Sequence, residues 1–371
     1  MIACSRCVMT SQVDPQLVVS EDGVCHHCLR YDALITVRVV RGEEGRALLR
    51  SRVEGIKRQG EGKPYDCLIG VSGGTDSTYV AYLVKSLGLR PLAVHFDNGW
   101  DSELAVANIR QVLEKLDIEL ESYVVDWPQF KDLQLAFLLA STPDGEIPSD
   151  HAIQATMWKT ALAIGTRTIV SGMNFATESS SVPNWAYGHS DWRYIKDVHK
   201  RFGTIPIPSY PHYSLAYLAY ANARGVRTLS ILNYVDYQKS EAQEVITSEL
   251  GWRDYGGKHH ESVYTRFFQG VVLPQKFGID KRYGHYSDLI NAGQLTRDEA
   301  MDLLKEPTYD PSLQDADRVY VLKKLGLSES QYEEIMDLPV RSYREFRNSY
   351  GQVQALRRGV NALRARGWYD R

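Results

Sequence analysis

The sequence lacks long hydrophobic runs, an excess of charge of one sign, internal repeats and low-complexity segments. No apolar stretch approaches the roughly 20 residues that a transmembrane helix needs, and the N-terminus lacks the basic and apolar regions of a signal peptide. The 43 basic and 46 acidic residues nearly cancel, so no overall field attracts nucleic acid or an anionic membrane. We therefore expect a cytoplasmic protein that binds neither nucleic acid nor a membrane.

Cysteine is also scarce, and its placement is uneven. Four of the five cysteines form two Cys-x-x-Cys pairs separated by 17 residues near the N-terminus. Two such pairs bring four thiolates within reach of one tetrahedral ion, and Zn²⁺ is the usual ion in a reducing compartment. Redox chemistry, the alternative, needs one exposed pair with a low thiol pKa. The sequence therefore predicts a structural zinc site made by Cys4, Cys7, Cys25 and Cys28.

The most informative stretch is SGGTDS at residues 72–77, which follows an apolar run and precedes a helical pattern. Its two glycines remove Cβ atoms, so backbone N–H groups of the turn and the helix start can point at one group of phosphate oxygens. The spacing and the lysine of a P-loop are absent. The alternative is a turn that only caps a helix. We favour a phosphate site made by Ser72, Gly73, Gly74, Thr75, Asp76 and Ser77.

Beyond Pro64 the pattern alternates between buried-type strands and helices, which predicts an α/β fold with a parallel sheet and helices on both faces. We expect a zinc-binding segment and linker helix over 1–62, an α/β domain over 63–250 that carries the phosphate site, and a mainly helical region over 251–371 that contributes to the substrate site. The expected strands are 66–71, 91–96, 121–125, 167–171 and 227–232, and the helices between them are 77–87, 102–116, 128–140 and 150–164.

Ligands of such sheets bind beyond the carboxyl ends of the strands, so the loops there are candidates for nucleotide binding. After the second strand, backbone amides and a carboxylate could hold a nucleoside, or the loop could only cap the next helix. After the 167–171 strand, small residues suit close approach to ATP, with a flexible surface loop as the alternative. Glu178 would join Asp76 on Mg²⁺. The candidates in these two loops are Phe96, Asp97, Asn98, Gly172, Asn174 and Glu178.

Two further groups are candidates for catalysis. Asp150 precedes His151 at the start of a predicted helix, where it either caps the helix or handles protons. Lys276, Lys281 and Arg282 lie in a polar stretch, and they are expected to stabilise a transferring phosphate or to bind a diphosphate of the substrate.

The SGGTDS motif resembles the signature of the PP-loop ATP pyrophosphatases, which cleave ATP between the α- and β-phosphates and transfer AMP to a substrate oxygen. With the cysteine pairs and the segments at 148–153, 172–178 and 260–282, the chain resembles the N-acetyl sugar amidotransferase family up to about residue 300. The resemblance implies conversion of an acetamido group on a nucleotide-linked sugar into an acetamidino group, in surface-polysaccharide (O-antigen type) biosynthesis. It implies ATP, Mg²⁺ and Zn²⁺ as cofactors.

The placement of cysteines also indicates where the nitrogen of the acetamidino group comes from. No cysteine follows Cys67, and Cys4 belongs to the zinc site, so the chain lacks the nucleophile of a built-in glutaminase. We therefore expect a separate glutaminase subunit that supplies ammonia, with or without a channel-forming subunit. The alternative function is that of a PP-loop tRNA-modifying thiolase with structural zinc, but Cys67, outside the pairs, lies in a buried-type strand. The sugar, the position of its acetamido group and the oligomeric state stay open.

Overall fold

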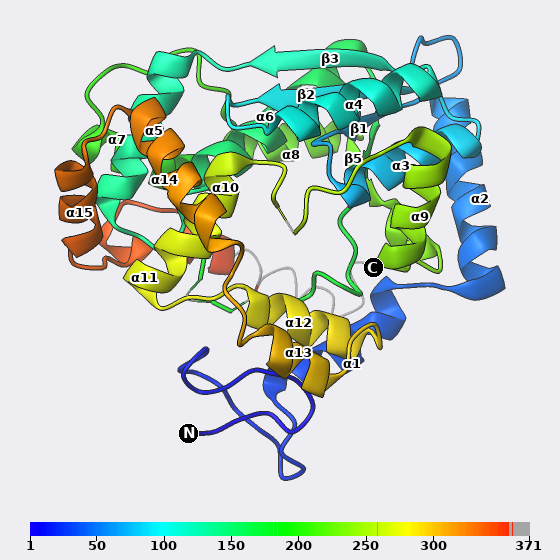
Figure 1. Ribbon diagram of the computed structural model, residues 1–371. Helices are drawn as coiled ribbons and strands as arrows, with labels where there is room; N and C mark the ends of the chain where they lie inside the picture. The colour runs from blue at the N-terminus through cyan, green and yellow to red at the C-terminus, as the bar shows by residue number, and fades with distance from the viewer. Residues whose placement is uncertain (181, 184, 258, 356–357, 359–371) are drawn as a thin grey trace.

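The computed structural model describes residues 1–180, 182–183, 185–257, 259–355 and 358 (Figure 1). Its centre is a five-stranded sheet with the order β3-β2-β1-β4-β5, and all neighbouring strands are parallel. This confirms the predicted fold class. The strands are β1 (Cys67–Gly70), β2 (Pro91–Asp97), β3 (Glu119–Val124), β4 (Thr168–Ser171) and β5 (Arg227–Ser230).

Alternation along β1 explains why both faces of the sheet are covered. Ile69 packs into a core with α2, α3, α4 and α9, whereas Leu68 faces the opposite way, onto Met157 and Ala161 of α6. Successive strand residues point to opposite faces, so a fully apolar strand requires helices on both sides. The helices are α2 (Gly42–Gln59), α3 (Thr75–Ser86), α4 (Glu103–Leu116), α5 (Trp127–Ala140), α6 (Ile147–Ile164) and α9 (Lys239–Leu250).

The chain reverses direction across the sheet between β1 and β4. It passes from β1 to β2 and β3 on one side, then returns through α5 and α6 to β4 on the other side. Ligands of parallel sheets bind beside such a reversal. The loops that follow β1 and β4 touch there, because a Cβ on Gly172 would lie 3.1 Å from the backbone carbonyl carbon of Asp76.

The region after residue 250 forms a helical layer that shares one core with the sheet domain. Phe96, Phe130 and Tyr194 of the first part pack in one cluster with Phe267 and Val321 of the second. The regions on either side of residue 250 therefore share one core. The further elements are α7 (Trp192–Phe202), α8 (Leu215–Ala223), η1 (Ile231–Tyr234), α10 (Val263–Phe267), η2 (Phe268–Val272), α11 (Leu273–Phe277), α12 (Arg282–Asn291), α13 (Arg297–Leu303), α14 (Pro311–Leu325), α15 (Glu329–Asp337) and η3 (Tyr343–Glu345).

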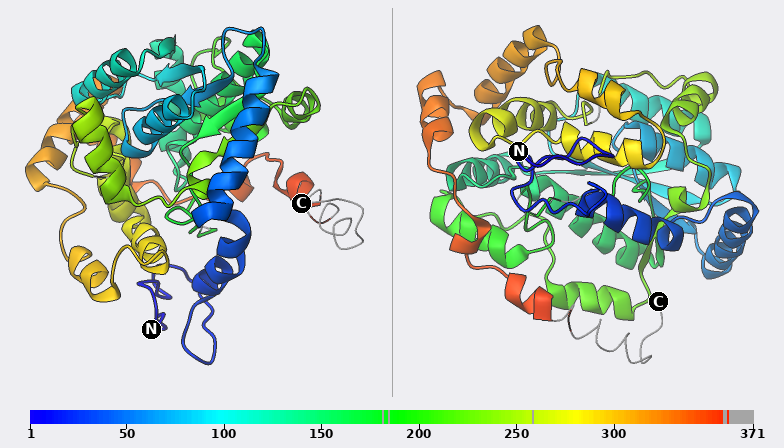
Figure 2. Two further views of the ribbon diagram at one scale, coloured as in Figure 1. Left: turned by 90° about the vertical axis from the view of Figure 1, so that its right-hand side faces the viewer. Right: turned by 90° about the horizontal axis from the view of Figure 1, so that it is seen from below.

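The N-terminal segment lies at the opposite end of the molecule from the sheet, against α12 and α13 (Figures 1 and 2). Tyr283 and Ile290 of α12 pack against the cysteine cluster, and Arg297 Nε donates to the carbonyl oxygen of Cys7 at 3.2 Å. The predicted linker helix is two helices, α1 (His26–Arg38) and α2, because the chain turns at residues 39–41. None of the helices in the described residues has the length and apolar character needed to cross a membrane.

Candidate active site

The turn after β1 is held in one shape by close contacts. Gly73 has φ +77°, and a Cβ there would lie 2.6 Å from the carbonyl oxygen of Ala105, so another residue would be strained and would clash. The Trp252 indole N–H donates to the carbonyl oxygen of Gly73 at 2.9 Å, and the hydroxyls of Ser72 and Ser77 are 3.2 Å apart. The turn is therefore preformed at the N-terminus of α3, where helix N–H groups favour an anion.

Two tyrosines from the second half of the chain contact this turn, although no sequence pattern indicated this contact for either. The Tyr237 hydroxyl donates to Asp76 Oδ1, and the Tyr255 hydroxyl accepts from the backbone N–H of Thr75 at 3.2 Å. Burial, together with Asp76, raises the pKa of Tyr237, and burial together with Glu261 raises the pKa of Tyr255. Both phenols therefore remain protonated at neutral pH, and Tyr237 can orient the Asp76 carboxylate.

The loop after β2 is shaped by its own side chains. Phe96 is 8 % exposed and stacks on Tyr123, so its side chain belongs to the core and only its backbone can contact a nucleoside. Asp97 Oδ1 accepts from the Gly99 N–H at 2.8 Å, and Asn98 Nδ2 donates to Ser149 Oγ at 3.1 Å. The backbone amides of this loop and the half-buried Asp97 carboxylate stay candidates for nucleoside contacts.

In the loop after β4, Asn174 is 1 % exposed, and its Oδ1 accepts from both the N–H and the hydroxyl of Thr177 at 2.9 Å. It stabilises the loop and is too buried to reach ATP. Glu178 instead lines a cavity of about 710 Å³. The loop is tied to α12 because Asp288 accepts from the hydroxyls of Ser179 at 2.6 Å and Ser180 at 2.8 Å.

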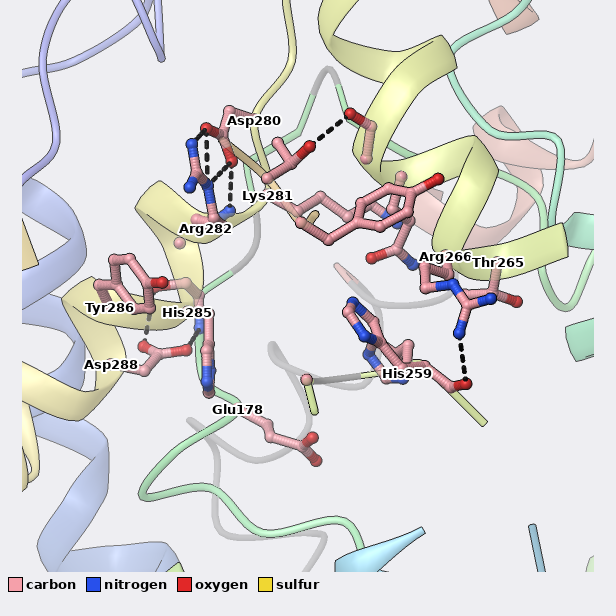
Figure 3. A pocket seen from close by; sticks show the side chains of 18 of the residues that line it. Glu178, His259, Thr265, Arg266, Asp280, Lys281, Arg282, His285, Tyr286 and Asp288 are labelled. Atoms are coloured by element: carbon pink, nitrogen blue, oxygen red, sulfur yellow. Dashed lines mark hydrogen bonds and ion pairs between the residues drawn. The ribbon is translucent and has the colours of Figure 1, made fainter. Parts of the chain in front are cut away.

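Three separate segments wall this cavity in Figure 3: the β4 loop with Glu178, residues 259–266, and residues 280–288. Among its cations, Arg266 forms a two-pronged ion pair with the buried Asp317 at 2.7 Å. Arg282 pairs with Asp280 at 2.8 Å and also donates to three carbonyl oxygens. These contacts hold the cavity wall in place. Most N–H groups of the Arg282 guanidinium are therefore already paired within the protein.

The three basic residues predicted to be catalytic therefore have different environments. Lys276 lies outside the cavity and donates to the carbonyl oxygens of Ile335, Met336 and Leu338 at 2.7–2.9 Å, where it caps the end of α15. We had expected Lys276 to be catalytic, but its ammonium group is fully used in hydrogen bonds to these three carbonyl oxygens. Lys281 lines the cavity, with its Nζ 3.5 Å from Glu146 Oε2. Lys281 therefore stays a candidate for catalysis.

Asp150 lies at the start of α6, but its partner is not His151. Its carboxylate is 3.2 Å from Nε2 of His189, which is also 2.9 Å from Asp144 Oδ2. His151 is buried, stacks on Tyr213, and has a pKa lowered to about 4 mainly by burial. Sequence neighbours thus point to different sides of one helix. His189 stands in an aromatic-rich segment whose pattern gave no sign of this role.

The four N-terminal cysteines are buried, and the structure brings their sulfur atoms together. Sγ separations are 4.0 Å for Cys4 and Cys28, and 3.7 Å for Cys7 and Cys25 and for Cys25 and Cys28. A tetrahedral zinc site with Zn–S bonds of about 2.3 Å has sulfur separations of about 3.8 Å. Backbone N–H groups also point at Cys4 Sγ, as expected for a thiolate. The predicted residues therefore fit a zinc ion.

A comparison with known protein families gives a match to the C-terminal part of the chain. Residues 261–358 match the family described as LPS biosynthesis protein WbpG-like, C-terminal domain. The match confirms the family resemblance seen in the sequence, and it covers Arg266, Lys281 and Tyr286 of the cavity wall.

A search of curated proteins gives no match. Among solved structures, NMN synthetase from Francisella tularensis is 13 % identical, with 80 % of this chain and 98 % of that chain aligned at a TM-score of 0.34. A predicted subunit of a tRNA methyltransferase from Methanocaldococcus jannaschii is also 13 % identical, with 49 % and 75 % aligned at a TM-score of 0.28. These likenesses are too weak to carry an argument about this chain.

Proposed function

We propose that the protein is an ATP-dependent amidotransferase that converts the acetamido group of a nucleotide-linked N-acetyl sugar into an acetamidino group, in the biosynthesis of LPS of the O-antigen type. One observation carries the proposal. The SGGTDS turn after β1 is joined through Tyr255 to a cavity, and many of the residues that line this cavity belong to the WbpG-like segment. ATP cleavage and sugar binding would thus be supplied by different parts of one chain.

The chemistry explains why an AMP-transferring site suits this substrate. An amide carbonyl is a poor electrophile and its oxygen is a poor leaving group. Attack of that oxygen on the α-phosphorus of ATP forms a C–O–P bond and releases pyrophosphate. Ammonia then adds at the imidate carbon, the C–O bond breaks, and AMP leaves with the original amide oxygen while the amidine remains.

In this mechanism different residues of the chain bind pyrophosphate, hold Mg²⁺ and stabilise the transferring phosphate. Residues 72–77 and the N-terminus of α3 bind the pyrophosphate, as the preformed turn and the close approach at Gly73 allow. Asp76 and Glu178 are the carboxylates that would hold Mg²⁺, which neutralises charge on the leaving pyrophosphate. Lys281 stabilises negative charge near the transferring phosphate.

The cavity suits a nucleotide-linked sugar in both size and chemistry. Its volume of about 710 Å³ lies in the usual range for sites that enclose small molecules. Trp185, Tyr286 and Tyr309 offer aromatic faces for a base or sugar ring, and Lys239 and His259 offer positive or hydrogen-bonding groups for a diphosphate. Zinc at the four cysteines would be structural, and ammonia would come from a separate glutaminase subunit, with or without a channel subunit.

The thiolase alternative receives less support. Cys67 is completely buried in β1, and burial raises the pKa of its thiol to about 12. A sulfur-transfer reaction needs an accessible thiolate.

The experiment is to incubate the protein with ATP, Mg²⁺, ammonium chloride and a panel of nucleotide-linked sugars. Sugars with an acetamido group should yield AMP, pyrophosphate and a product that has exchanged oxygen for NH and gained positive charge. Matched sugars with a hydroxyl in place of the acetamido group are the control. Release of ADP and orthophosphate, or AMP formation that ignores the acetamido group, would contradict the proposal.

A further inference from the structure

Beside the cavity, Lys281 belongs to a cluster with four ionisable side chains that have no task in the mechanism above. His189 Nε2 lies between Asp144 Oδ2 at 2.9 Å and Asp150 Oδ2 at 3.2 Å, and Lys281 Nζ is 3.5 Å from Glu146 Oε2. The five residues come from the start of α6, the segment before α7 and the start of α12. Only tertiary folding brings them together.

The cluster has a buried wall and an open side. Asp144 and Glu146 are 3 % and 8 % exposed, and the side chains of Asp150, His189 and Lys281 are 48 %, 36 % and 31 % exposed. Tyr264, only 2 % exposed, points its hydroxyl at this wall, because a Cβ on Gly145 would lie 2.9 Å from that oxygen. Among the described residues this hydroxyl has no hydrogen-bond partner. A buried hydroxyl without a protein partner beside carboxylates is expected to contact a polar ligand or ion.

The charges of the cluster determine which ligand fits. Three carboxylates face one lysine and one histidine, so the fully ionised cluster carries one more negative than positive charge. One monovalent cation neutralises it, whereas a divalent metal would leave an excess of positive charge next to Lys281 and His189. Carboxylate and phenol oxygens accept hydrogen bonds in several directions, which matches a cation with four N–H groups.

Building on the proposed function, we propose that this cluster, defined as Asp144, Glu146, Asp150, His189 and Lys281, binds ammonium and that Asp150 accepts its proton. The N–H bond of ammonium breaks, and the proton passes to the Asp150 carboxylate. The freed electron pair of ammonia then attacks the imidate carbon, and AMP leaves with its oxygen. The proton then leaves Asp150 directly to solvent, which reaches its partly exposed side chain. The sum is ammonium plus adenylated imidate giving amidinium, AMP and one proton.

The position of Asp150 supports this role. It lies in the first turn of α6, and the preceding Ser149 accepts a hydrogen bond from Asn98 in the loop after β2. The cluster is thus joined to the carboxyl edge of the sheet, where ATP binds in this fold. Lys281 belongs both to the cluster and to the cavity wall, so an ammonium ion here lies beside the sugar site.

The titration of the cluster agrees with a proton acceptor. Although water reaches part of Asp150, the surrounding protein desolvates it and raises its pKa to about 6, an effect that His189 partly offsets. Burial lowers the pKa of His189, but Asp144 and Asp150 outweigh burial and raise it to about 9. The groups that face Asp150 from the elements around it are Asp144, Glu146, His189, Lys281, Tyr210 and Tyr213.

The test separates the two half-reactions. Exchange of labelled pyrophosphate into ATP, dependent on the sugar nucleotide, reports AMP transfer and needs no ammonia. Asp150→Asn should keep this exchange within about two-fold while amidine formation near pH 7 falls by about 10²-fold, the usual contribution of a general base. Asp315→Asn, on the exposed face of α14, is the matched control and should change neither rate.

The wild-type pH profile provides a second test that does not depend on a variant folding. At fixed total ammonium, amidine formation should rise as Asp150 ionises near pH 6 and level off above about pH 7. A rate that keeps rising in proportion to free ammonia above pH 8 would overturn the proposal, as would equal loss of both half-reactions in folded Asp150→Asn. If the wild-type protein shows no exchange that depends on the sugar nucleotide, the proposed function itself fails.

Discussion

The two ends of the proposed active site are built in opposite ways. The phosphate end is the turn at residues 72–77, one continuous segment whose backbone and side chains are shaped by the glycines and by the start of α3. The sugar end is the cavity, which is assembled from the β4 loop, segments between 255 and 270, α12 and the loop before α14, and Tyr255 contacts both ends. A continuous turn binds by backbone geometry, which the sequence encodes locally. An assembled wall binds by side chains whose partners are set by tertiary packing.

The comparison predicts the largest loss at the phosphate end. Asp76→Ala removes a carboxylate at the N-terminus of α3 that Tyr237 holds in place. The rate of pyrophosphate release should fall by about 10³-fold, because charge on the leaving group is then poorly neutralised. Steady-state release assays measure the rate, and unchanged circular dichroism would show that the fold is intact. Loss of less than about ten-fold would place the metal carboxylate elsewhere.

The N-terminal segment provides a second comparison, because its cysteine cluster packs on α12, whose residues line the cavity. Cys25→Ser removes one of four ligands, so zinc content should fall well below one ion per chain and the melting temperature should drop. The affinity for the sugar nucleotide should weaken, since α12 packs on this segment, while ATP affinity should change little. Metal analysis and binding assays test this, and a fully retained zinc ion would contradict the assignment.

Lys281→Met tests the sugar end directly. Lys281 lines the cavity and is paired with Glu146, so its removal should slow AMP transfer by about 10²-fold. Pyrophosphate exchange measures this step. An exchange rate equal to that of the wild type would show that Lys281 does not contribute to AMP transfer.

Lys276→Met is its matched control and should have the smallest effect on turnover. Its ammonium caps the end of α15, so the substitution should lower the free energy of unfolding by about 1–2 kcal/mol and leave kcat/KM unchanged. Denaturant unfolding and kinetics on the same sample measure both quantities. A large kinetic effect without destabilisation would reverse the distinction drawn between these two lysines.

The features predicted from sequence are those that depend on neighbouring residues. The alternation of strands and helices, the turn at residues 72–77 and the two cysteine pairs were each visible as short patterns, and the structure contains all three. Phe96 and Asn174 were named because their loops were correctly placed, but both side chains turn into the interior. A loop's position follows from the pattern of strands, whereas the direction of one side chain does not.

The features that sequence reasoning missed depend on residues far apart in the chain. Tyr237 and Tyr255 reach the turn from more than 150 positions away, and His189 meets Asp150 across the segment between α6 and α7. Lys276 and Lys281 are five positions apart with the same charge, yet one caps a helix and the other faces the cavity. Only the packing of α11, α12 and α15 distinguishes them.

The central claim is that the amide oxygen of the sugar leaves on AMP, and an isotope label tests it most directly. A nucleotide-linked sugar whose acetamido oxygen is ¹⁸O should be incubated with the protein, ATP, Mg²⁺ and ammonium, and the phosphate of AMP should be examined by mass spectrometry. Our account predicts one ¹⁸O atom in each AMP formed and none in pyrophosphate. AMP without the label, or a label recovered in orthophosphate, would contradict it.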